Sequence, residues 1–192
     1  MSRLLAVFTL LLSAPLLFSA DAKPVHVLLH TEAGDIEVEV DSVHAPATAE
    51  NFLRYVDKGF YNGGGFYRTV TLDNQPQNKV KIEVIQGGNP EHEGEDFPPI
   101  KLEPTHKTGI KHIEGAISMA RDTPDSATSE FFICVREQPE LDFGGRRNPD
   151  GQGFAAFGHV VKGMDVVRKI QKAPSDGQAL TPPIKILSAK RM

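Results

Sequence analysis

The stretch that decides the fold is VLLHTEAGDIEVEV, residues 27–40. Its last five residues alternate apolar and charged side chains, which is typical of a β-strand with one buried face. The apolar run at residues 27–31 lies before it, across the turn Ala33-Gly34-Asp35. The stretch therefore predicts a β-hairpin that buries one face in a core.

Seven further strands are predicted beyond this hairpin, each bounded by Gly, Pro, Asn or Asp. They cover residues 66–70, 80–85, 100–103, 116–120, 130–135, 154–160 and 184–188. Many short strands with only two helices favour an antiparallel barrel over a parallel sheet.

The first of the two predicted helices covers residues 45–56, with Pro46 in its first turn and Gly59 after its end. Its buried face is predicted to consist of Ala49, Phe52, Leu53 and Val56. The second helix is predicted from the spacing of Met164, Val167 and Ile170.

The first 22 residues predict a secretory signal peptide. Arg3 gives a positive start, residues 4–18 form an apolar run, and Ala20-Asp21-Ala22 has the small-x-small pattern of a cleavage site. A membrane anchor is the alternative, but this run is shorter than the roughly 20 apolar residues that span a bilayer, and it contains Pro15. We therefore expect residues 1–22 to be removed and residues 23–192 to form one domain.

Composition narrows the classes of function. The formal net charge of −4 argues against nucleic acid as a partner. The single cysteine, Cys134, cannot form an intramolecular disulfide and is expected to be buried and inert. The seven histidines lack the spacing of a zinc site, and the acidic loop at residues 91–96 is expected to be solvated rather than to hold a cation. No metal is expected.

Five short motifs occur in a fixed order along the chain: FYR at residues 66–68, QGG at 86–88, ISMAR at 117–121, SEFFI at 129–133 and FAAFG at 154–158. From about Val25 to about Leu187 the chain resembles the cyclophilin family of peptidyl-prolyl cis/trans isomerases, in particular its exported bacterial branch. The resemblance implies a mainly β fold, a closed eight-stranded antiparallel barrel capped by two α-helices.

The resemblance also implies a catalytic pair, Arg68 and Gln86. Rotation about an X-Pro bond must overcome an amide barrier of about 18–20 kcal/mol, but it breaks no bond, so no cofactor is expected. Arg68 would donate to the prolyl nitrogen as the amide twists, since a guanidinium stays charged and holds its donors rigidly. Gln86 would accept from Arg68 and donate to the substrate backbone.

The remaining site residues implied by the resemblance would bind the substrate. The apolar slot for the proline ring is expected from Val84, Phe132, Leu141 and Phe154. Phe131 and Phe132 are neighbours on one strand, so they must point to opposite faces. The backbone at Ala120 and Arg121 would pair with the extended peptide as an added strand does.

Four positions depart from the usual family pattern. Glu83 stands where a pocket phenylalanine is usual, Glu130 replaces a glutamine, Glu140 replaces an aromatic residue, and Phe154 replaces a histidine or tyrosine. We expect Glu130 to contact the substrate region; if it pairs with Arg68, it would lower catalysis without abolishing it. The loops at residues 71–78 and 142–153 are longer than the family minimum and either select substrates or act only as connectors.

These features predict an exported isomerase that acts on proline-containing polypeptides, as a monomer and without integral membrane association once the signal is removed. The periplasm is the expected location, with secretion as the alternative. A different class remains open: a proline-peptide-binding chaperone module with little or no turnover. An exported all-β binding domain unrelated to proline would require the spacing of Arg68 and Gln86 to be coincidental.

Overall fold

The computed structural model of the protein describes residues 24–89 and 96–192. The predicted signal peptide, residues 1–22, lies outside the described residues, and so does nearly all of the acidic loop at residues 91–96.

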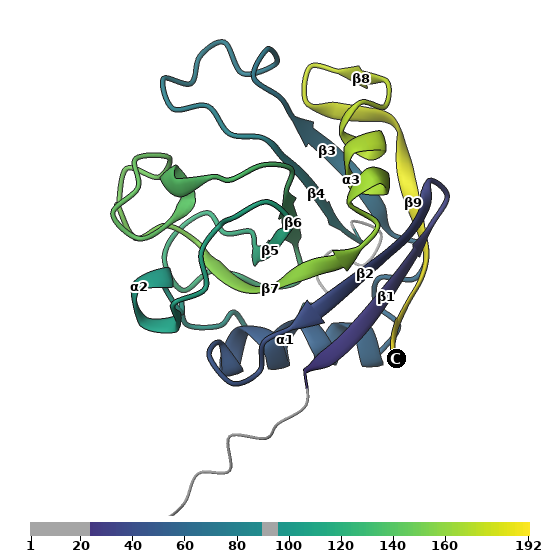
Figure 1. Ribbon diagram of the computed structural model, residues 1–192, viewed down its shortest axis with the longest axis horizontal. Helices are drawn as coiled ribbons and strands as arrows, with labels where there is room; N and C mark the ends of the chain where they lie inside the picture. Colours follow the sequence, from purple (N-terminus) through teal and green to yellow (C-terminus); the bar gives the residue numbers. More distant parts are fainter. Residues whose placement is uncertain (1–23, 90–95) are drawn as a thin grey trace, which may run out of the picture.

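A closed antiparallel barrel forms the body of the protein (Figure 1). Its strands are β1 (Val25–Thr31), β2 (Gly34–Val40), β3 (Gly65–Val70), β4 (Val84–Gly88), β5 (Ala116–Met119), β6 (Phe131–Cys134), β7 (Ala155–Lys162) and β9 (Ala179–Arg191). They follow the order β1-β2-β7-β5-β6-β4-β3-β9, and β1 pairs with β9 to close the ring of eight. The two-residue β8 (Ser175–Asp176) only pairs with β9. The predicted eight-stranded barrel is confirmed.

In the described part of the chain, three α-helices accompany the barrel: α1 (Pro46–Asp57), α2 (Thr105–Thr108) and α3 (Met164–Gln171). The two predicted helices correspond to α1 and α3, whereas the single-turn α2 was not predicted. The start of α1 is capped from a distant segment, because the Glu103 carboxylate accepts from the N–H groups of Ala47 and Thr48 at 3.2 and 2.8 Å. Gly59 follows the end of α1 with a φ of 67°, in the left-handed region that favours glycine.

The hydrophobic core lies inside the barrel and between the barrel and the inner face of α1. All four residues predicted for that face are buried: Ala49, Phe52, Leu53 and Val56. Phe52 contacts the rings of Tyr61, Phe131 and Phe157, with centroids 5.5, 5.6 and 5.1 Å away. On α3, Val167 and Ile170 are buried. Cys134 is also buried, as expected, and its burial raises the pKa of the thiol.

One predicted strand is wrong, and another begins later than predicted. Residues 80–83 are not part of β4, because the backbone of Ile82 pairs with a side chain instead of a strand: Ile82 N–H donates to Gln75 Oε1, and Gln75 Nε2 donates to the Ile82 carbonyl. Residues 100–103 make only one isolated bridge, between Ile100 and Ala127. The last strand, in contrast, is longer than its predicted extent of 184–188.

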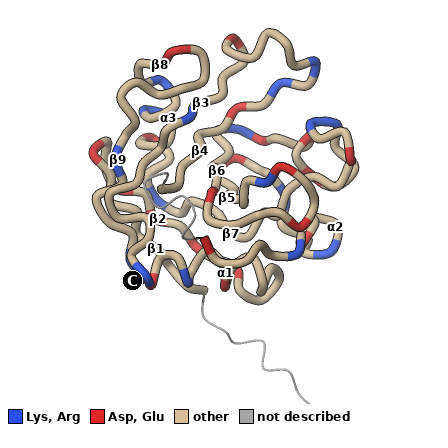
Figure 2. The backbone as a smooth tube through the Cα atoms, turned by 180° about the vertical axis from the view of Figure 1, so that it is seen from behind, with Lys and Arg blue, Asp and Glu red and all other residues tan. Residues whose placement is uncertain are grey.

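Charges of both signs are interspersed along the described chain (Figure 2). Within the described residues, no helix is long and apolar enough to cross a membrane.

Candidate functional site

One row of residues runs across four neighbouring strands of the barrel wall. Arg68 on β3 pairs with Gln86 on β4, Gln86 pairs with Phe132 on β6, and Phe132 pairs with Ser118 on β5. Directly paired residues on adjacent strands have side chains close together on one face. The sheet register therefore brings Arg68, Gln86 and Phe132 together.

An irregularity in β3 decides where Arg68 points. Phe66 and Arg68 are two positions apart, so in a regular strand both side chains would share a face. The pairing of β3 with both neighbouring strands shifts between these two residues. Phe66 is therefore fully buried in the core, while Arg68 lines a cavity on the outside of the barrel.

The side chains of the two adjacent phenylalanines of β6 point to opposite faces of the strand, as predicted. Phe131 belongs to the barrel core, whereas Phe132 belongs to a second apolar cluster that includes Val84 and Leu141. The prediction that they face opposite sides is confirmed.

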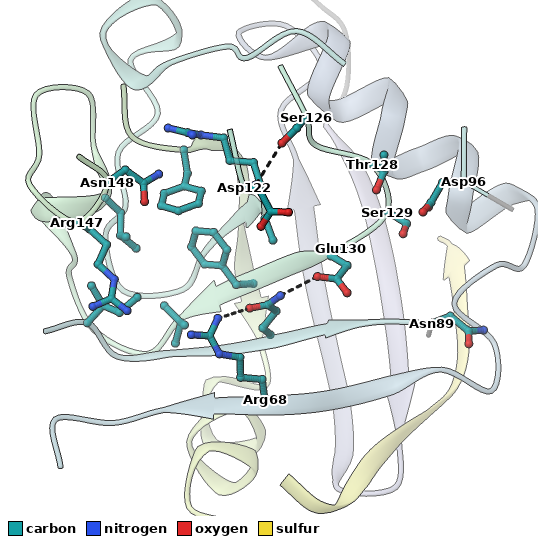
Figure 3. A pocket seen from close by; sticks show the side chains of 18 residues that line it. Arg68, Asn89, Asp96, Asp122, Ser126, Thr128, Ser129, Glu130, Arg147 and Asn148 are labelled. Atoms are coloured by element: carbon teal, nitrogen blue, oxygen red, sulfur yellow. Dashed lines mark hydrogen bonds between the residues drawn. The ribbon is translucent and has the colours of Figure 1, made fainter. Parts of the chain in front are cut away.

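The cavity has a volume of about 680 Å³ (Figure 3). It is lined by all nine predicted site residues: Arg68, Val84, Gln86, Ala120, Arg121, Glu130, Phe132, Leu141 and Phe154. The apolar part is a slot in which the rings of Phe132 and Phe154 meet edge to face, with centroids 5.3 Å apart. Ile82 lines the cavity too, while the neighbouring Glu83 is not among the lining residues and has Arg136 at 3.6 Å.

The guanidinium of Arg68 is held by two neutral amide oxygens. Its NH1 donates to Gln86 Oε1 at 2.7 Å, and its Nε and NH2 donate to Gln178 Oε1 at 2.9 and 2.7 Å. Gln178 lies in the turn between β8 and β9, and its own amide donates to the Asn74 carbonyl at 3.2 Å. Two neutral acceptors thus fix the direction of the Arg68 guanidinium.

Glu130 contacts Gln86 rather than Arg68. Gln86 Nε2 donates to Glu130 Oε2 and to the Tyr67 hydroxyl, both at 2.8 Å. The sequence left open whether Glu130 pairs with Arg68; within residues 24–89 and 96–192, no ion pair joins them, and Gln86 lies between the two groups. Burial, followed by the hydrogen bond to Glu130, raises the pKa of Tyr67, so its hydroxyl stays protonated. The amide that was expected to donate to substrate is therefore occupied in this structure.

Ala120 and Arg121 form hydrogen bonds within the protein, to residue 130 and to the loop at residues 142–153. The Ala120 N–H donates to the Glu130 carbonyl at 2.8 Å, so this N–H is not available to an added peptide strand. The Arg121 side chain is only 1% exposed and forms a two-bond ion pair with Asp150. Its Nε and NH2 also donate to the Gly153 carbonyl at 2.9 and 2.6 Å. Arg121 thereby anchors the long loop at residues 142–153.

A buried polar chain lies behind the slot. His112 is 1% exposed, with Nδ1 at 2.8 Å from Asp142 Oδ1 and Nε2 at 3.0 Å from Ser118 Oγ. Its ring stacks on Phe132 with centroids 5.9 Å apart. Burial lowers the pKa of His112, although the hydrogen bond to Asp142 opposes the shift. Ser118 is fully buried, so this Ser-His-Asp arrangement supports the slot and is closed to a substrate.

Sequence reasoning missed several residues of this site. Gln178 meets Arg68 only through the β8–β9 turn, and no motif marks it. Arg147 and Asn148 reach the cavity from the loop at residues 142–153, whose unusual length was the only signal. Among the described residues, no group of three or more metal-ligating side chains gathers.

Known proteins share both the fold and the sequence. A crystal structure of a cyclophilin type peptidyl-prolyl cis-trans isomerase from Cryptosporidium parvum, in the presence of the dipeptide Ala-Pro, matches with a TM-score of 0.70 and 22% identity. The match covers 87% of this chain and 98% of that chain. This likeness shows the fold.

Curated relatives extend the likeness to the sequence. Peptidyl-prolyl cis-trans isomerase A of Dickeya dadantii is 39% identical, covering 86% of this chain and 83% of its own length. Peptidyl-prolyl cis-trans isomerase B of Escherichia coli is 38% identical, covering 76% of this chain and 83% of its own. A family model described as cyclophilin type peptidyl-prolyl cis-trans isomerase/CLD matches residues 26–191.

The fold and these relatives together place the protein in one class of enzyme, the β-barrel isomerases of X-Pro peptide bonds. The chain belongs to the cyclophilin-type peptidyl-prolyl cis-trans isomerase family.

Proposed function

We propose that this isomerase uses Arg68 as its catalytic donor, Gln86 as the orienting group and the slot of Val84, Phe132, Leu141 and Phe154 as the proline site. The single observation that carries the proposal is the convergence of a guanidinium, an amide and an apolar slot on one cavity. Rotation localises the lone pair on the prolyl nitrogen, and a donor that binds this twisted form more tightly than the planar one lowers the barrier. Each 1.4 kcal/mol of such preference is worth about tenfold in rate.

The contacts in the cavity indicate a separate role for the slot and for the two glutamines. The slot holds the ring, so that the amide lies beside the guanidinium. Gln178 and Gln86 fix that guanidinium before substrate arrives, which avoids reorganisation at the moment of rotation. All of these residues come from one chain, which supports action as a monomer. No bond is made or broken, so the rotation itself requires no cofactor.

The substrate class we propose is the proline-containing polypeptide. The C. parvum relative was crystallised in the presence of Ala-Pro, which supports a proline-sized slot in this fold. We further propose that the chain is exported through its first 22 residues and assists the folding of proteins in the periplasm, with secretion as the alternative. The apolar run after Arg3 and the bacterial relatives support this proposal.

The test is exchange spectroscopy by nuclear magnetic resonance on a short peptide with one X-Pro bond. Arg68→Ala should reduce kcat/KM by about 100-fold or more, the loss typical of removing a donor to a developing charge. Peptide affinity should change much less, because the slot remains.

Arg136→Ala is the matched control, since this side chain is 73% exposed and lies outside the cavity lining. Unchanged turnover in Arg68→Ala would remove Arg68 from the mechanism. Wild-type binding without any acceleration of exchange would instead favour the chaperone-module alternative.

A further inference from the structure

The two unusually long loops meet at Arg147. Arg147 NH1 donates to Gln75 Oε1 at 3.1 Å and to the Val80 carbonyl at 2.7 Å, and both acceptors lie between β3 and β4. Gln75 is 1% exposed and also donates to the carbonyls of Thr71 and Ile82. The loop at residues 142–153 thus presents an arginine that the other loop holds in place.

Arg147 has no carboxylate partner among the residues that the structure describes. Its neighbour Arg146 forms a two-bond pair with Glu140, and Arg121 forms one with Asp150. The Arg147 guanidinium instead donates only to neutral oxygens. A half-buried cation without a counter-ion is costly, and burial, followed by the nearby charge of Arg68, lowers the pKa of Arg147.

A second donor without a partner among the described residues, on Asn148, also indicates that an acceptor is missing beside Arg147. Asn148 lines the cavity beside Arg147, and its Nδ2 is buried without a hydrogen-bond partner. Buried donors are nearly always paired, so an orphaned one next to an unpaired cation indicates a place for an acceptor. A carboxylate bound beside Arg147 would supply the counter-charge that this side chain lacks, because it carries a negative charge and two acceptor oxygens. The Asn148 amide, which is enclosed in this structure, would have to turn toward the cavity to reach such an oxygen.

Charged side chains of opposite sign line different parts of the cavity, which also contains Arg68 in the middle and Arg121, itself paired with Asp150. Arg147 and Asn148 lie at one side of the slot, and Asp96, Asp122 and Glu130 lie on the other (Figure 3). An anionic group of a bound chain would be repelled at the acidic side and attracted at the Arg147 side. This asymmetry makes the position of an acidic group relative to proline matter.

We propose that Arg147 and Asn148 form a carboxylate-binding subsite beside the proline slot, which selects chains with an acidic group near the isomerised proline. The inference rests on the proposed function, because it takes the slot to be the proline site. The carboxylate comes from an Asp or Glu side chain or from the end of a chain, and the experiment separates these sources.

The test compares peptides that share one proline and carry Glu, Gln or Lys at each of the two positions before and after it, with both ends blocked. At one of these positions, the Glu peptide should exceed its Gln counterpart about fivefold in kcat/KM, a gain expected of a partly exposed charge pair. The Lys peptide should fall below the Gln peptide there. A neutral peptide with a free carboxyl end, compared with its amide, tests chain ends as the source.

Arg147→Gln should abolish the Glu-over-Gln preference, and Arg147→Lys should retain part of it. Lys172→Gln is the control, because it removes one positive charge from an exposed side chain outside the cavity lining. Comparing two peptides on the same variant cancels any general loss of activity, and thermal unfolding checks that Arg147→Gln is folded.

Equal rates for acidic and neutral peptides at every position and at the chain end would overturn the subsite, as would a preference that survives in Arg147→Gln. If the wild type accelerates no peptide at all, the proposed function fails instead. In that case, the ratio of dissociation constants for the Glu and Gln peptides, measured by titration, still decides the subsite.

Discussion

Arg68 donates to two side-chain oxygens, and both belong to glutamines. A carboxylate in either place would bind the guanidinium more tightly but would cancel much of its field. In the proposed mechanism, neutral acceptors fix the direction of the donors and leave the charge available to the prolyl nitrogen. The choice of amide over acid therefore suits a group that must act on a weak, developing lone pair.

Gln178→Ala should lower kcat by about tenfold with little change in KM, because Arg68 loses two of its hydrogen bonds while the slot is untouched. Gln178→Glu restores the acceptor and should recover part of the loss. The measurement is exchange spectroscopy over a range of peptide concentrations. A rise in KM with constant kcat would show that Gln178 serves binding rather than the direction of Arg68.

Glu130→Gln should raise kcat/KM by about threefold, since it removes the carboxylate that holds Gln86 Nε2 and weakens the field of Arg68. Glu130→Asp, which keeps the charge, should not produce this gain. An equal or lower kcat/KM in Glu130→Gln would show that the acidic residue does not restrain catalysis.

The sequence predicts which residues line the cavity better than it predicts the hydrogen bonds between them. The motifs of the family resemblance led to Arg68, Gln86 and the slot, and the regular pairing of β4 with β6 places Gln86 beside Phe132. Sequence reasoning missed Gln178 and Arg147, which reach the cavity from turns whose path depends on tertiary contacts. It left open whether Glu130 reaches Arg68, since spacing does not tell which of two adjacent polar groups a side chain contacts; in the structure Glu130 accepts from Gln86.

At the scale of elements, the strands predicted from hydrophobic alternation are present where their backbone pairs with a neighbouring strand. Alternation failed at residues 80–83, where the Gln75 side chain takes the hydrogen bonds that a strand would make. The irregularity in β3 was equally hidden, because alternation alone would place Phe66 and Arg68 on one face. Local patterns report which side chains prefer burial, but not which groups satisfy the backbone.

His112 makes the stability of the fold depend on pH. It lies between α2 and a short 3₁₀-helical turn, Pro139–Leu141. Its buried ring has a lowered pKa in the folded state, so below the unfolded value of about 6.5 the unfolded chain binds a proton that the folded chain does not. The free energy of unfolding should therefore be fully present above about pH 6.5 and should fall as the pH drops below it.

Urea unfolding at a series of pH values would measure this fall. His112→Asn should flatten the decrease below about pH 6.5, whereas the exposed His159→Asn should leave it in place. The groups that face His112 are Asp142 and Lys111, so both variants retain the same charged surroundings. An identical decrease in His112→Asn and the wild type would assign the pH dependence to other groups.

At the scale of the whole molecule, one barrel serves both as core and as scaffold for the cavity. Its inner face carries the aromatic cluster, and its outer face carries Arg68, Gln86 and Phe132. The ring of eight strands was predicted from the family resemblance. Its closure by β1 and β9 could not be read from local patterns, because it joins strands at opposite ends of the sequence.

Export is tested on the whole chain. If residues 1–22 are removed during export, the protein recovered from the periplasm should begin at Lys23, as measured by intact mass. The barrel should be unaffected, because β1 begins at Val25. Recovery of a chain that still carries residues 1–22, or its retention in the cytoplasm, would contradict the proposal.

The pairing of Val27 with Arg191 ties the earliest strand to the latest one. A growing polypeptide therefore cannot complete its hydrogen-bonded ring until the ribosome has made nearly all of it. Under the export proposed above, such a delay would keep the nascent chain unfolded until it enters a translocation channel.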